Sequence, residues 1–328
     1  MEKNLISIIT PCYNTGNLLS RLLDSILMQD YPSVEMYAID DGSSDNTAEV
    51  IKNYIPKFMD RGYQLTYIYQ QNSGQSAAIN KGLKLVKGEF LVWPDSDDWY
   101  STRYALSKMV DVLQNTDESV SIVRCLAEYI DESSLKVLYR YIPTEQTDWF
   151  EDCLFARPNS WYCPGGYMAK VKLLDETIKN REIYTQKDAG QNWQLLLPLL
   201  YNKKCITINE YHYKILEREA SHSRGRYKSY EEKIQKIRSY ENTIVFTLMN
   251  MSFMPEEEKE QYVKDIHVKY LLECYGTSWI FLKRQMALKF QKELEDRYGV
   301  NIPLYERVRM ELLWIYKKMR NCISGAHL

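Results

Sequence analysis

The sequence has little of what marks a secreted, zinc-binding or nucleic-acid-binding protein. Its seven cysteines form no Cys-x-x-Cys pair, and an odd number in a chain of 328 residues does not suit a disulfide framework. The four histidines are too scattered to form a zinc site. The formal net charge is −2, so no basic excess favours nucleic acid. We therefore expect reduced thiols, a cytoplasmic protein and no nucleic-acid partner.

Long apolar runs are also missing. A membrane-spanning helix needs roughly 18 to 20 consecutive apolar residues, and the sequence contains no such stretch. The apolar run near the N-terminus is broken by Pro11 and is too short for a signal peptide. The sequence therefore predicts a protein that is soluble or peripheral at a membrane, with enough length for one large domain and an appendage, or for two domains.

The first half of the chain alternates between strand and helix patterns. Apolar and β-branched runs predict strands at 5–10, 34–40, 65–70, 89–94 and 120–130. Leu and Ile at helical spacing predict a helix at 18–30, and a second helix follows a cap at Ser44 or Asp45. A third is predicted at 75–88. Strands that alternate with helices imply right-handed crossovers and a mostly parallel sheet, which is an α/β fold.

The second half is less regular and ends in helices. The patterns predict a strand that runs into a turn or helix at 163–174. A helix is predicted at 190–201 and a strand at 203–215. Beyond about residue 228 the pattern is helical only, and Ser229 with Glu232 forms a capping-box signature. The polar stretch 216–227 marks a boundary. We expect two domains, 1–220 and 221–328.

Three carboxylates within four residues follow a predicted strand in the segment LVWPDSDDWY: Asp95, Asp97 and Asp98. Taken alone, such a turn is more often a solvated loop than a metal site. However, ligands of open α/β sheets bind outside the carboxyl ends of the strands, and Asp40 and Asp41 lie at another such end. Residues 89–102 contain no Lys or Arg. We therefore expect a bound cation, and not a basic side chain, to relieve the repulsion.

Several familiar motifs are excluded. The acidic turn lacks the glycine at the sixth position and the glutamate at the twelfth that an EF-hand requires. No G-x-G-x-x-G follows the first strand, and no P-loop is present. A nucleotidyltransferase would need a glycine-rich, basic phosphate loop near the N-terminus, which ITPCYNTGN does not supply.

Four blocks occur in order, each at a strand end or helix start: SIITPCYN, AIDDGSSDNT, QNSGQSAAINKGL and WPDSDDWY. Together they closely resemble the nucleotide-sugar-binding half of family 2 glycosyltransferases, strongly over 4–105 and weakly over 160–225. The resemblance implies the GT-A fold, a Rossmann-like and mostly parallel sheet flanked by helices, here with a C-terminal all-helical extension. It also implies inverting transfer from a nucleotide diphosphate sugar, commonly a UDP-sugar, to a glycan or lipid-linked glycan acceptor in bacterial surface polysaccharide synthesis.

The resemblance assigns roles on the donor side. Asp97 would bind Mn²⁺ or Mg²⁺ directly, and Asp95 would lie beside the ribose or the waters of the metal. Oxygen ligands from one or two carboxylates, completed by substrate phosphates, are what these ions prefer. Asp41 would accept a hydrogen bond from the base, and Tyr13 would pack on it. The residues expected to contact the nucleotide sugar in this half are Pro11, Tyr13, Asp41, Gln75 and Asp95.

The acceptor side departs from the family pattern. The acidic pair that usually supplies the general base corresponds to Gln191-Asn192, neither of which can act as a base. Asp188 is the leading candidate for the base, with a helix cap as the alternative role. Glu151 and Asp152 are more remote alternatives for the base. His222 and Arg224 fall where relatives carry a loop that closes over the diphosphate, although an interdomain linker is an equal alternative.

Two further alternatives stay open. Without the acidic pair, the protein could be a catalytically degenerate nucleotide-sugar- or glycan-binding partner in a glycan assembly complex. Trp161 and Trp193 are either sugar platforms or core residues. The C-terminal helices combine Lys and Arg runs with aromatic residues such as Trp314 and Tyr316. They would contact an anionic membrane surface, form a homodimer surface, or make a bundle with solvated charges.

Overall fold

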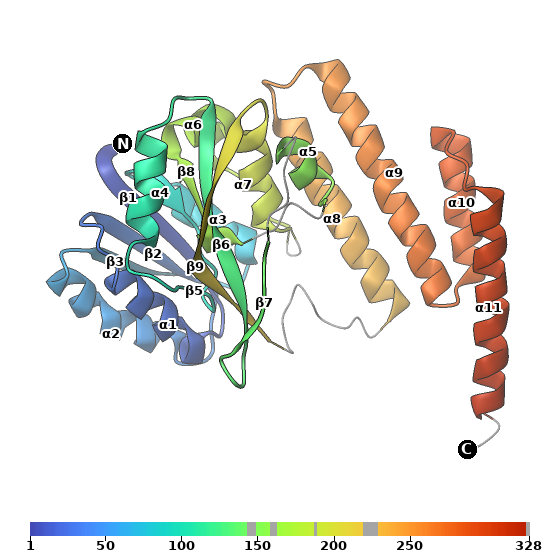
Figure 1. The fold of residues 1–328 in the computed structure, drawn as a ribbon, viewed down its shortest axis with the longest axis horizontal. Coiled ribbons are helices and arrows are strands. Elements are labelled where there is room, and N and C mark those ends of the chain that lie inside the picture. The colour runs from blue at the N-terminus through green and yellow to red at the C-terminus, as the bar shows by residue number, and fades with distance from the viewer. Residues whose placement is uncertain (143–148, 158–162, 187–188, 219–228, 326–328) are drawn as a thin grey trace. The chain divides into compact units, whose positions relative to one another are not determined.

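A computed structural model describes residues 1–142, 149–157, 163–186, 189–218 and 229–325. The chain divides into two compact units, Met1–Gly225 and Arg226–Leu328 (Figure 1). The first is an α/β unit and the second is helical, and each is described by itself.

The first unit is built on one mixed sheet. Its strands are β1 (Glu2–Cys12), β2 (Val34–Asp40), β3 (Gln64–Tyr69), β4 (Gly88–Val92), β5 (Trp99–Tyr100), β6 (Val120–Asp131), β7 (Val137–Arg140), β8 (Tyr167–Lys170) and β9 (Lys204–Glu217). They lie in the order β3-β2-β1-β4-β8-β6-β9-β5, and β7 pairs with β6. The predicted α/β fold class is confirmed.

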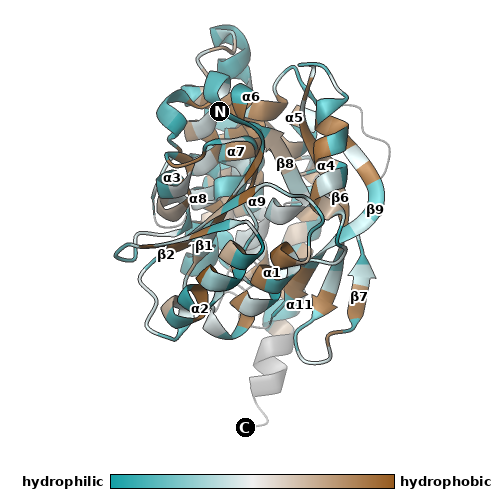
Figure 2. Ribbon diagram, turned by 90° about the vertical axis from the view of Figure 1, so that its left-hand side faces the viewer, coloured by the Kyte–Doolittle hydropathy of each residue, from teal (hydrophilic) through white to brown (hydrophobic). Residues whose placement is uncertain are grey.

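Helices connect and cover these strands. They are α1 (Gly16–Leu27), α2 (Thr47–Asp60), α3 (Gln75–Leu83), α4 (Ala105–Gln114), α5 (Trp149–Leu154), α6 (Val171–Thr177) and α7 (Gln191–Leu200), with 3₁₀ turns η1 (Pro164–Gly166) and η2 (Lys179–Arg181). Right-handed crossovers place α1 and α2 on one face of the sheet and α3 on the other. Hydrophobic and hydrophilic residues alternate along α1 and α2, as amphipathic packing requires (Figure 2). The helix predicted to reach residue 88 ends at Leu83, because Gly88 already begins β4.

The core lies around the central parallel strands. Every residue of β2 is buried, as expected for a strand covered by helices on both faces. In β1 the side chains of Ile6, Ile8 and Ile9 are fully buried. Gly82 of α3 packs closely on β1, since a Cβ there would lie 2.4 Å from Ile9 Cγ2. This close contact fixes the distance between α3 and the sheet, and therefore the position of Gln75, the first residue of α3.

The strand directions bring several loops to one edge of the sheet. β1, β2, β3 and β4 run parallel. β8 is antiparallel to both β4 and β6, and β9 is parallel to β6, so β9 points the same way as β4. The loops that follow β1, β2, β3, β4 and β9 therefore all begin at one edge. This is the carboxyl edge, where open α/β sheets bind their ligands.

The second unit consists of α8 (Tyr230–Asn250), α9 (Glu256–Ile280), α10 (Arg284–Tyr298) and α11 (Leu304–Gly325). The predicted cap at the start of α8 is present, because Glu232 N donates to Ser229 Oγ at 3.1 Å. A buried carboxylate, Glu241, joins α8 to α9: it accepts a hydrogen bond from Arg238 Nη1 at 2.6 Å and lies 2.7 Å from His267 Nδ1. Within the described part of the chain, no helix is both long and apolar enough to span a bilayer.

Candidate functional site

The acidic turn lies between β4 and β5 at the carboxyl edge. β5 pairs antiparallel with β9, so the turn is held against the end of that strand. Asp98 is buried, and its Oδ1 accepts a hydrogen bond from Leu216 N at 2.8 Å. Burial, and then the charges of Asp97 and Asp95, raise the pKa of Asp98 well above its ordinary range. Asp98 therefore ties the turn to β9.

Asp95 is contacted by the first residues of two helices. Its Oδ1 accepts a hydrogen bond from Gln75 Nε2 at 2.8 Å, and Gln191 Nε2 lies 3.5 Å from the same atom. No described residue donates to its Oδ2. Burial and the neighbouring charge of Asp97 raise the pKa of Asp95 to about 7. The amide contacts orient this carboxylate without neutralising it.

Asp97 has a basic partner that the sequence analysis missed. Arg218, the first residue after β9, places Nη2 2.6 Å from Asp97 Oδ2. The expectation that no Lys or Arg relieves the repulsion in this turn is therefore wrong. The physical reason is the direction of β9, which brings its carboxyl end to the edge where β4 ends. The predicted strand ends at 215, and Arg218 falls in the stretch 216–227 that the sequence analysis assigns to a domain boundary, so no pattern in the sequence signals this contact.

The pair Asp95 and Asp97 fits a divalent cation that is shared with a phosphate ligand. Each carboxylate retains one oxygen that accepts nothing from the described residues, and both side chains are partly exposed. Over the described ranges, no three His, Cys, Asp or Glu side chains converge as a metal-binding group. Mg²⁺ and Mn²⁺ accept one or two carboxylates when waters and substrate phosphates supply the other oxygens. A cation here would thus need a ligand that brings its own oxygens.

The loops after β1 and β2 are tied together beside this pair. Ser44 N donates to Asn14 Oδ1 at 2.8 Å, and Gly16 N donates to Asp45 Oδ2 at 3.0 Å. Pro11 is buried in β1, whereas Tyr13 lies beyond the strand with 46% of its surface exposed. Tyr13 thus offers an open ring at the carboxyl edge, and its predicted contact with a base stays a prediction.

Asp41 organises the loop that leads into α3. Its Oδ1 accepts from Ser73 N at 2.8 Å and from Gln70 Nε2 at 2.7 Å, and its Oδ2 accepts from Gly74 N at 2.9 Å. Asp40 is a turn residue, since its Oδ1 accepts from Ser43 N at 2.8 Å. In the structure, Asp41 therefore holds the loop before α3 in place. Its predicted hydrogen bond with a nucleotide base stays a prediction.

Helix α3 also holds the segment that leads to α7. Asn80 makes two hydrogen bonds with the backbone of Ile183, from Nδ2 to the carbonyl and from the amide N–H to Oδ1, both at 2.8 Å. Ser76 Oγ donates to the carbonyl of Ala189. Helix α3 therefore places Gln75 beside Asp95, and it also holds the residues that precede Gln191.

Replacing Asn80 by alanine should lower the free energy of unfolding by about 1 to 3 kcal/mol, because two backbone groups of Ile183 lose their partner. Thermal or urea unfolding measures this change. An Asn80→Asp variant keeps an acceptor for the Ile183 N–H and should lose less. Equal stability of Asn80→Ala and the unaltered chain would show that this clamp contributes nothing.

Several predicted site residues lie outside the described residues: Asp188, Trp161, His222 and Arg224. Trp193 is described, and it is buried with Nε1 donating to the carbonyl of Cys153 at 3.0 Å. This burial assigns Trp193 to the core and not to a sugar platform. The more remote carboxylates of α5 are also engaged, since Glu151 pairs with Arg157 Nη2 at 2.8 Å and Asp152 is buried.

Comparison with known proteins places this geometry in a family. Residues 7–175 match the family model described as glycosyl transferase family 2. An uncharacterized glycosyltransferase of Rickettsia typhi is 35% identical over 188 residues, which are 55% of this chain and 56% of the relative. Glycosyltransferase GlyA of Streptococcus pneumoniae is 39% identical over 99 residues, covering 30% of this chain and 14% of the relative. The chain thus spans little more than half of the first relative and far less of the second.

Solved structures share the fold. TarS of S. aureus, residues 1–349 in complex with UDP-GlcNAc, aligns with a TM-score of 0.61 at 17% identity, covering 88% of this chain and 79% of that one. The mannosyltransferase PcManGT from Pyrobaculum calidifontis, in complex with GDP-Man and Mn²⁺, aligns with a TM-score of 0.53 at 16% identity, covering 99% and 84%. At these identities the likeness shows the fold alone, and that fold is GT-A, as the sequence predicts.

Proposed function

The chain belongs to glycosyl transferase family 2, and from this premise we propose that it is an inverting enzyme with a nucleoside diphosphate sugar as donor. The acceptor is a glycan or a lipid-linked glycan of a bacterial surface polysaccharide. The observation that carries the donor side is the carboxylate pair Asp95 and Asp97, set at the carboxyl edge beside Arg218. Release of a nucleoside diphosphate from a panel of sugar donors tests the proposal, with UDP-sugars expected to react. No release from any donor would contradict it.

The donor lies along the loops after β1, β2, β3 and β4. Tyr13 packs on the base, and Asp41 accepts a hydrogen bond from it once the loop before α3 adjusts. Asp97, with Asp95 beside it, would hold Mn²⁺ or Mg²⁺, and the ion would supply Lewis-acid stabilisation of the departing nucleoside diphosphate. Gln75, at the start of α3, keeps the Asp95 carboxylate in orientation through its 2.8 Å hydrogen bond.

Arg218 changes partners when the donor binds. In the structure its guanidinium occupies Asp97 Oδ2, while its Nε is buried and has no hydrogen-bond partner. If Asp97 held a divalent cation, its negative charge would be compensated and the ion pair with Arg218 would weaken. The planar guanidinium is well suited to phosphate oxygens. Arg218 therefore stabilises the charge that develops on the leaving diphosphate.

Replacing Arg218 by alanine should lower kcat by roughly 10- to 100-fold. The reason is that the leaving diphosphate loses one positively charged side chain that stabilises it. The same change should lower the Mn²⁺ concentration needed for half-maximal nucleotide binding, because the cation no longer competes with a guanidinium for Asp97. Titration of Mn²⁺ against a fixed nucleotide measures the second effect separately from turnover.

The matched control for this prediction is Arg140→Ala. Arg140 also pairs with a carboxylate, Glu128, at 2.8 Å, but it lies on the β7 strand. It should leave both kcat and the Mn²⁺ requirement unchanged. If Arg218→Ala matches the unaltered chain in both measurements, then Arg218 acts only as a structural partner of Asp97.

On the acceptor side we propose Asp188 as the general base, which takes the proton from the attacking hydroxyl. The support comes from its neighbours in the chain. Ala189 is held by Ser76 of α3, and Gln191 lies beside Asp95. Glu151 and Asp152 are weaker candidates, because the first is ion-paired and the second is buried.

A second function is favoured by one observation. Gln191 and Asn192 stand where relatives carry an acidic pair, and Gln191 is buried with its amide directed at Asp95. Such a chain could bind a nucleotide sugar or a glycan within an assembly complex without transferring a sugar. Measuring hydrolysis of the donor in the absence of acceptor distinguishes the enzyme from the binding protein. Slow hydrolysis indicates an enzyme, since a pure binding protein releases no nucleoside diphosphate.

A further inference from the structure

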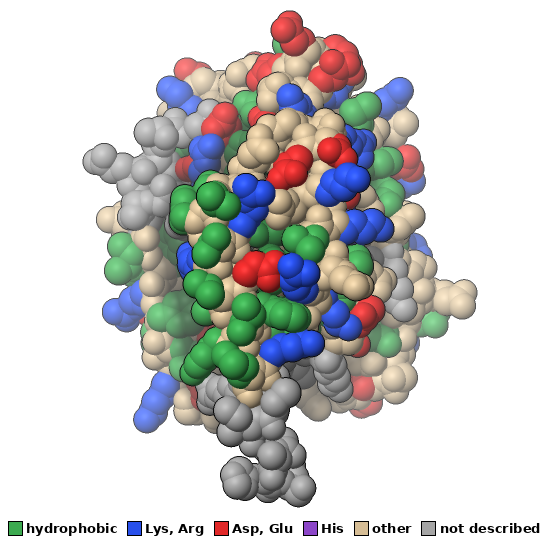
Figure 3. Space-filling view, turned by 90° about the vertical axis from the view of Figure 1, so that its right-hand side faces the viewer, with side chains coloured by type: hydrophobic (Ala, Val, Ile, Leu, Met, Phe, Trp, Pro, Cys, Tyr) green, Lys and Arg blue, Asp and Glu red, His purple; other side chains and the backbone are tan. Residues whose placement is uncertain are grey.

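Helix α11 carries an exposed apolar surface that no described residue covers. Its members are exposed by between 42% (Leu313) and 73% (Tyr305) of their surface. They are Leu304, Tyr305, Val308, Leu312, Leu313, Ile315, Tyr316 and Met319. Figure 3 shows hydrophobic side chains gathered on this face of the molecule. Such continuous apolar surfaces mark interaction sites.

The remaining sides of α11 pack on the rest of the helical unit, and they carry charged residues as well as Trp314. Arg284 of α10 pairs with Glu311 at 2.7 Å, and Trp314 Nε1 donates to the carbonyl of Leu282 at 3.3 Å. A helix that belongs only to its own domain buries its apolar side and exposes its polar side. The exposed apolar side of α11 is the arrangement expected of a helix that has a partner.

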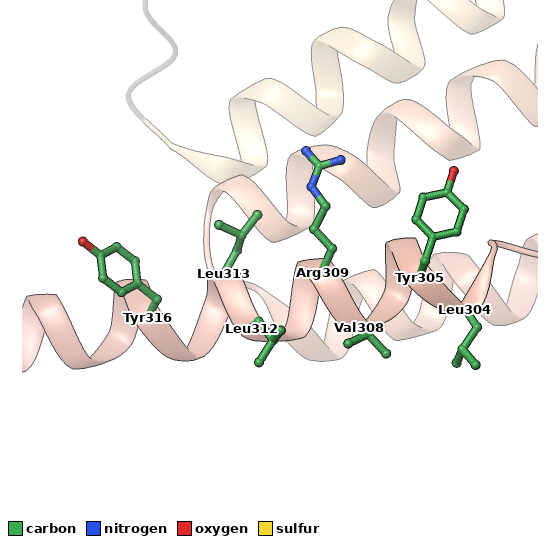
Figure 4. Close-up of a pocket in the computed structure, with 7 residues that line it drawn as sticks. All are labelled: Leu304, Tyr305, Val308, Arg309, Leu312, Leu313 and Tyr316. Atoms are coloured by element: carbon green, nitrogen blue, oxygen red, sulfur yellow. The ribbon is translucent and has the colours of Figure 1, made fainter.

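The spacing of the exposed residues identifies the partner as another helix. Tyr305, Val308, Leu312, Ile315 and Met319 follow one another at intervals of three, four, three and four residues, which is the a/d pattern of a coiled coil. We call these five residues the α11 seam. Figure 4 shows the side chains of this part of α11 leaving the helix in two rows, with a groove along it. Seam side chains of a facing helix fill such a groove.

The flanking charges identify the facing helix as a second copy that runs antiparallel. In this arrangement the positions that precede each a residue face one another, which sets Glu311 opposite Lys318 of the second copy. Glu311 lies at the margin of the seam, where it pairs with Arg284 of its own unit, and Lys318 would add a second positive neighbour. Arg309 then lies opposite Tyr316, where it can stack on the ring. A parallel pair places no opposite charges across the seam. We propose that two copies of this chain associate through an antiparallel pairing of their α11 seams about a two-fold axis.

This dimer is independent of the donor site and of the proposed reaction. The seam spans about 15 residues, or roughly 20 Å of helix. Two helices in contact over that length bury less surface than a standard permanent interface does. The association should therefore depend on concentration.

Sedimentation velocity of the full chain over a range of concentrations tests the proposal. The expected mass rises from 38.9 kDa toward twice that value with concentration. Leu312→Lys should remain monomeric throughout, because it buries a charge in the seam. The control Met249→Lys alters an exposed residue of α8 and should dimerise normally. Unchanged thermal unfolding of both variants excludes misfolding as the cause.

A second pair of variants tests the antiparallel orientation. Lys318→Glu should weaken the dimer by placing two negative charges opposite each other, whereas Lys317→Glu makes the same change of charge on the adjacent position outside the seam and should not. Equal effects of the two would overturn the antiparallel pairing. An unaltered chain that stays monomeric at every concentration would overturn the dimer, as would Leu312-dependent binding of the monomer to anionic phospholipid vesicles, which would assign the surface to a membrane.

Discussion

Replacing Asp97 by alanine should lower sugar transfer by two to three orders of magnitude, which corresponds to about 3 to 4 kcal/mol of lost transition-state stabilisation. Asp97 is the carboxylate that would hold the cation against the leaving diphosphate. Its Oδ2 is paired with Arg218 at 2.6 Å in the structure, so both the cation and Arg218 depend on it. The rate is measured as UDP released from a UDP-sugar in the presence of Mn²⁺.

A matched variant separates this effect from a general loss of charge. Asp60→Ala removes an exposed aspartate at the end of α2, ahead of β3 and therefore at the opposite edge of the sheet. It should turn over at the unaltered rate. A second readout is binding, because nucleotide affinity in Asp97→Ala should no longer respond to Mn²⁺. Near-normal turnover of Asp97→Ala with Mn²⁺ present would remove Asp97 from the metal site.

Replacing Asp188 by asparagine should leave nucleotide binding intact and lower transfer by about 100- to 10,000-fold, the range expected for loss of a general base. Asparagine preserves size and hydrogen bonding but cannot take up the proton of the acceptor hydroxyl. Nucleotide affinity by calorimetry and transfer with an accepted glycan are measured on the same preparation, so that a folding defect and a chemical defect give different results.

Asp30→Asn is the control for Asp188→Asn, since Asp30 is exposed in the loop between α1 and β2. It should change neither measurement. Full transfer activity in Asp188→Asn would place the base elsewhere, and Glu151→Gln would then be the next variant to measure. Loss of nucleotide binding in Asp188→Asn would instead indicate that Asp188 supports the donor site and does not act as the base.

Local patterns predict the elements that carry the proposed donor residues. The β2 strand occupies the predicted residues 34–40, and α3 begins at Gln75, as its pattern indicates. The placement of Asp95 and Asp97 at the carboxyl edge follows from their position after a strand of a parallel sheet. These features depend on residues that are near one another in sequence, so a single chain is enough to reveal them.

Tertiary pairing decides what the sequence could not predict. Arg218 meets Asp97 only because β8 reverses the direction between β4 and β6, and no local pattern encodes that order. Asp98 lies in the same acidic turn as Asp97, yet its hydrogen bond to Leu216 N depends on the pairing of β5 with β9. The outward orientation of the α11 seam likewise depends on contacts with other segments of the helical unit, among them Glu311 with Arg284 and Trp314 with the carbonyl of Leu282.

The central claim is that the carboxyl edge binds a nucleoside diphosphate together with a divalent cation. Thermal unfolding of the full chain with UDP, GDP or dTDP, each with and without Mn²⁺, tests it most directly, since a bound ligand stabilises the folded state in proportion to the logarithm of its concentration over Kd. We predict that UDP with Mn²⁺ raises Tm clearly more than UDP or Mn²⁺ alone, and that Asp97→Ala abolishes this difference. A chain whose Tm responds to no nucleoside diphosphate, with or without Mn²⁺, would contradict the account.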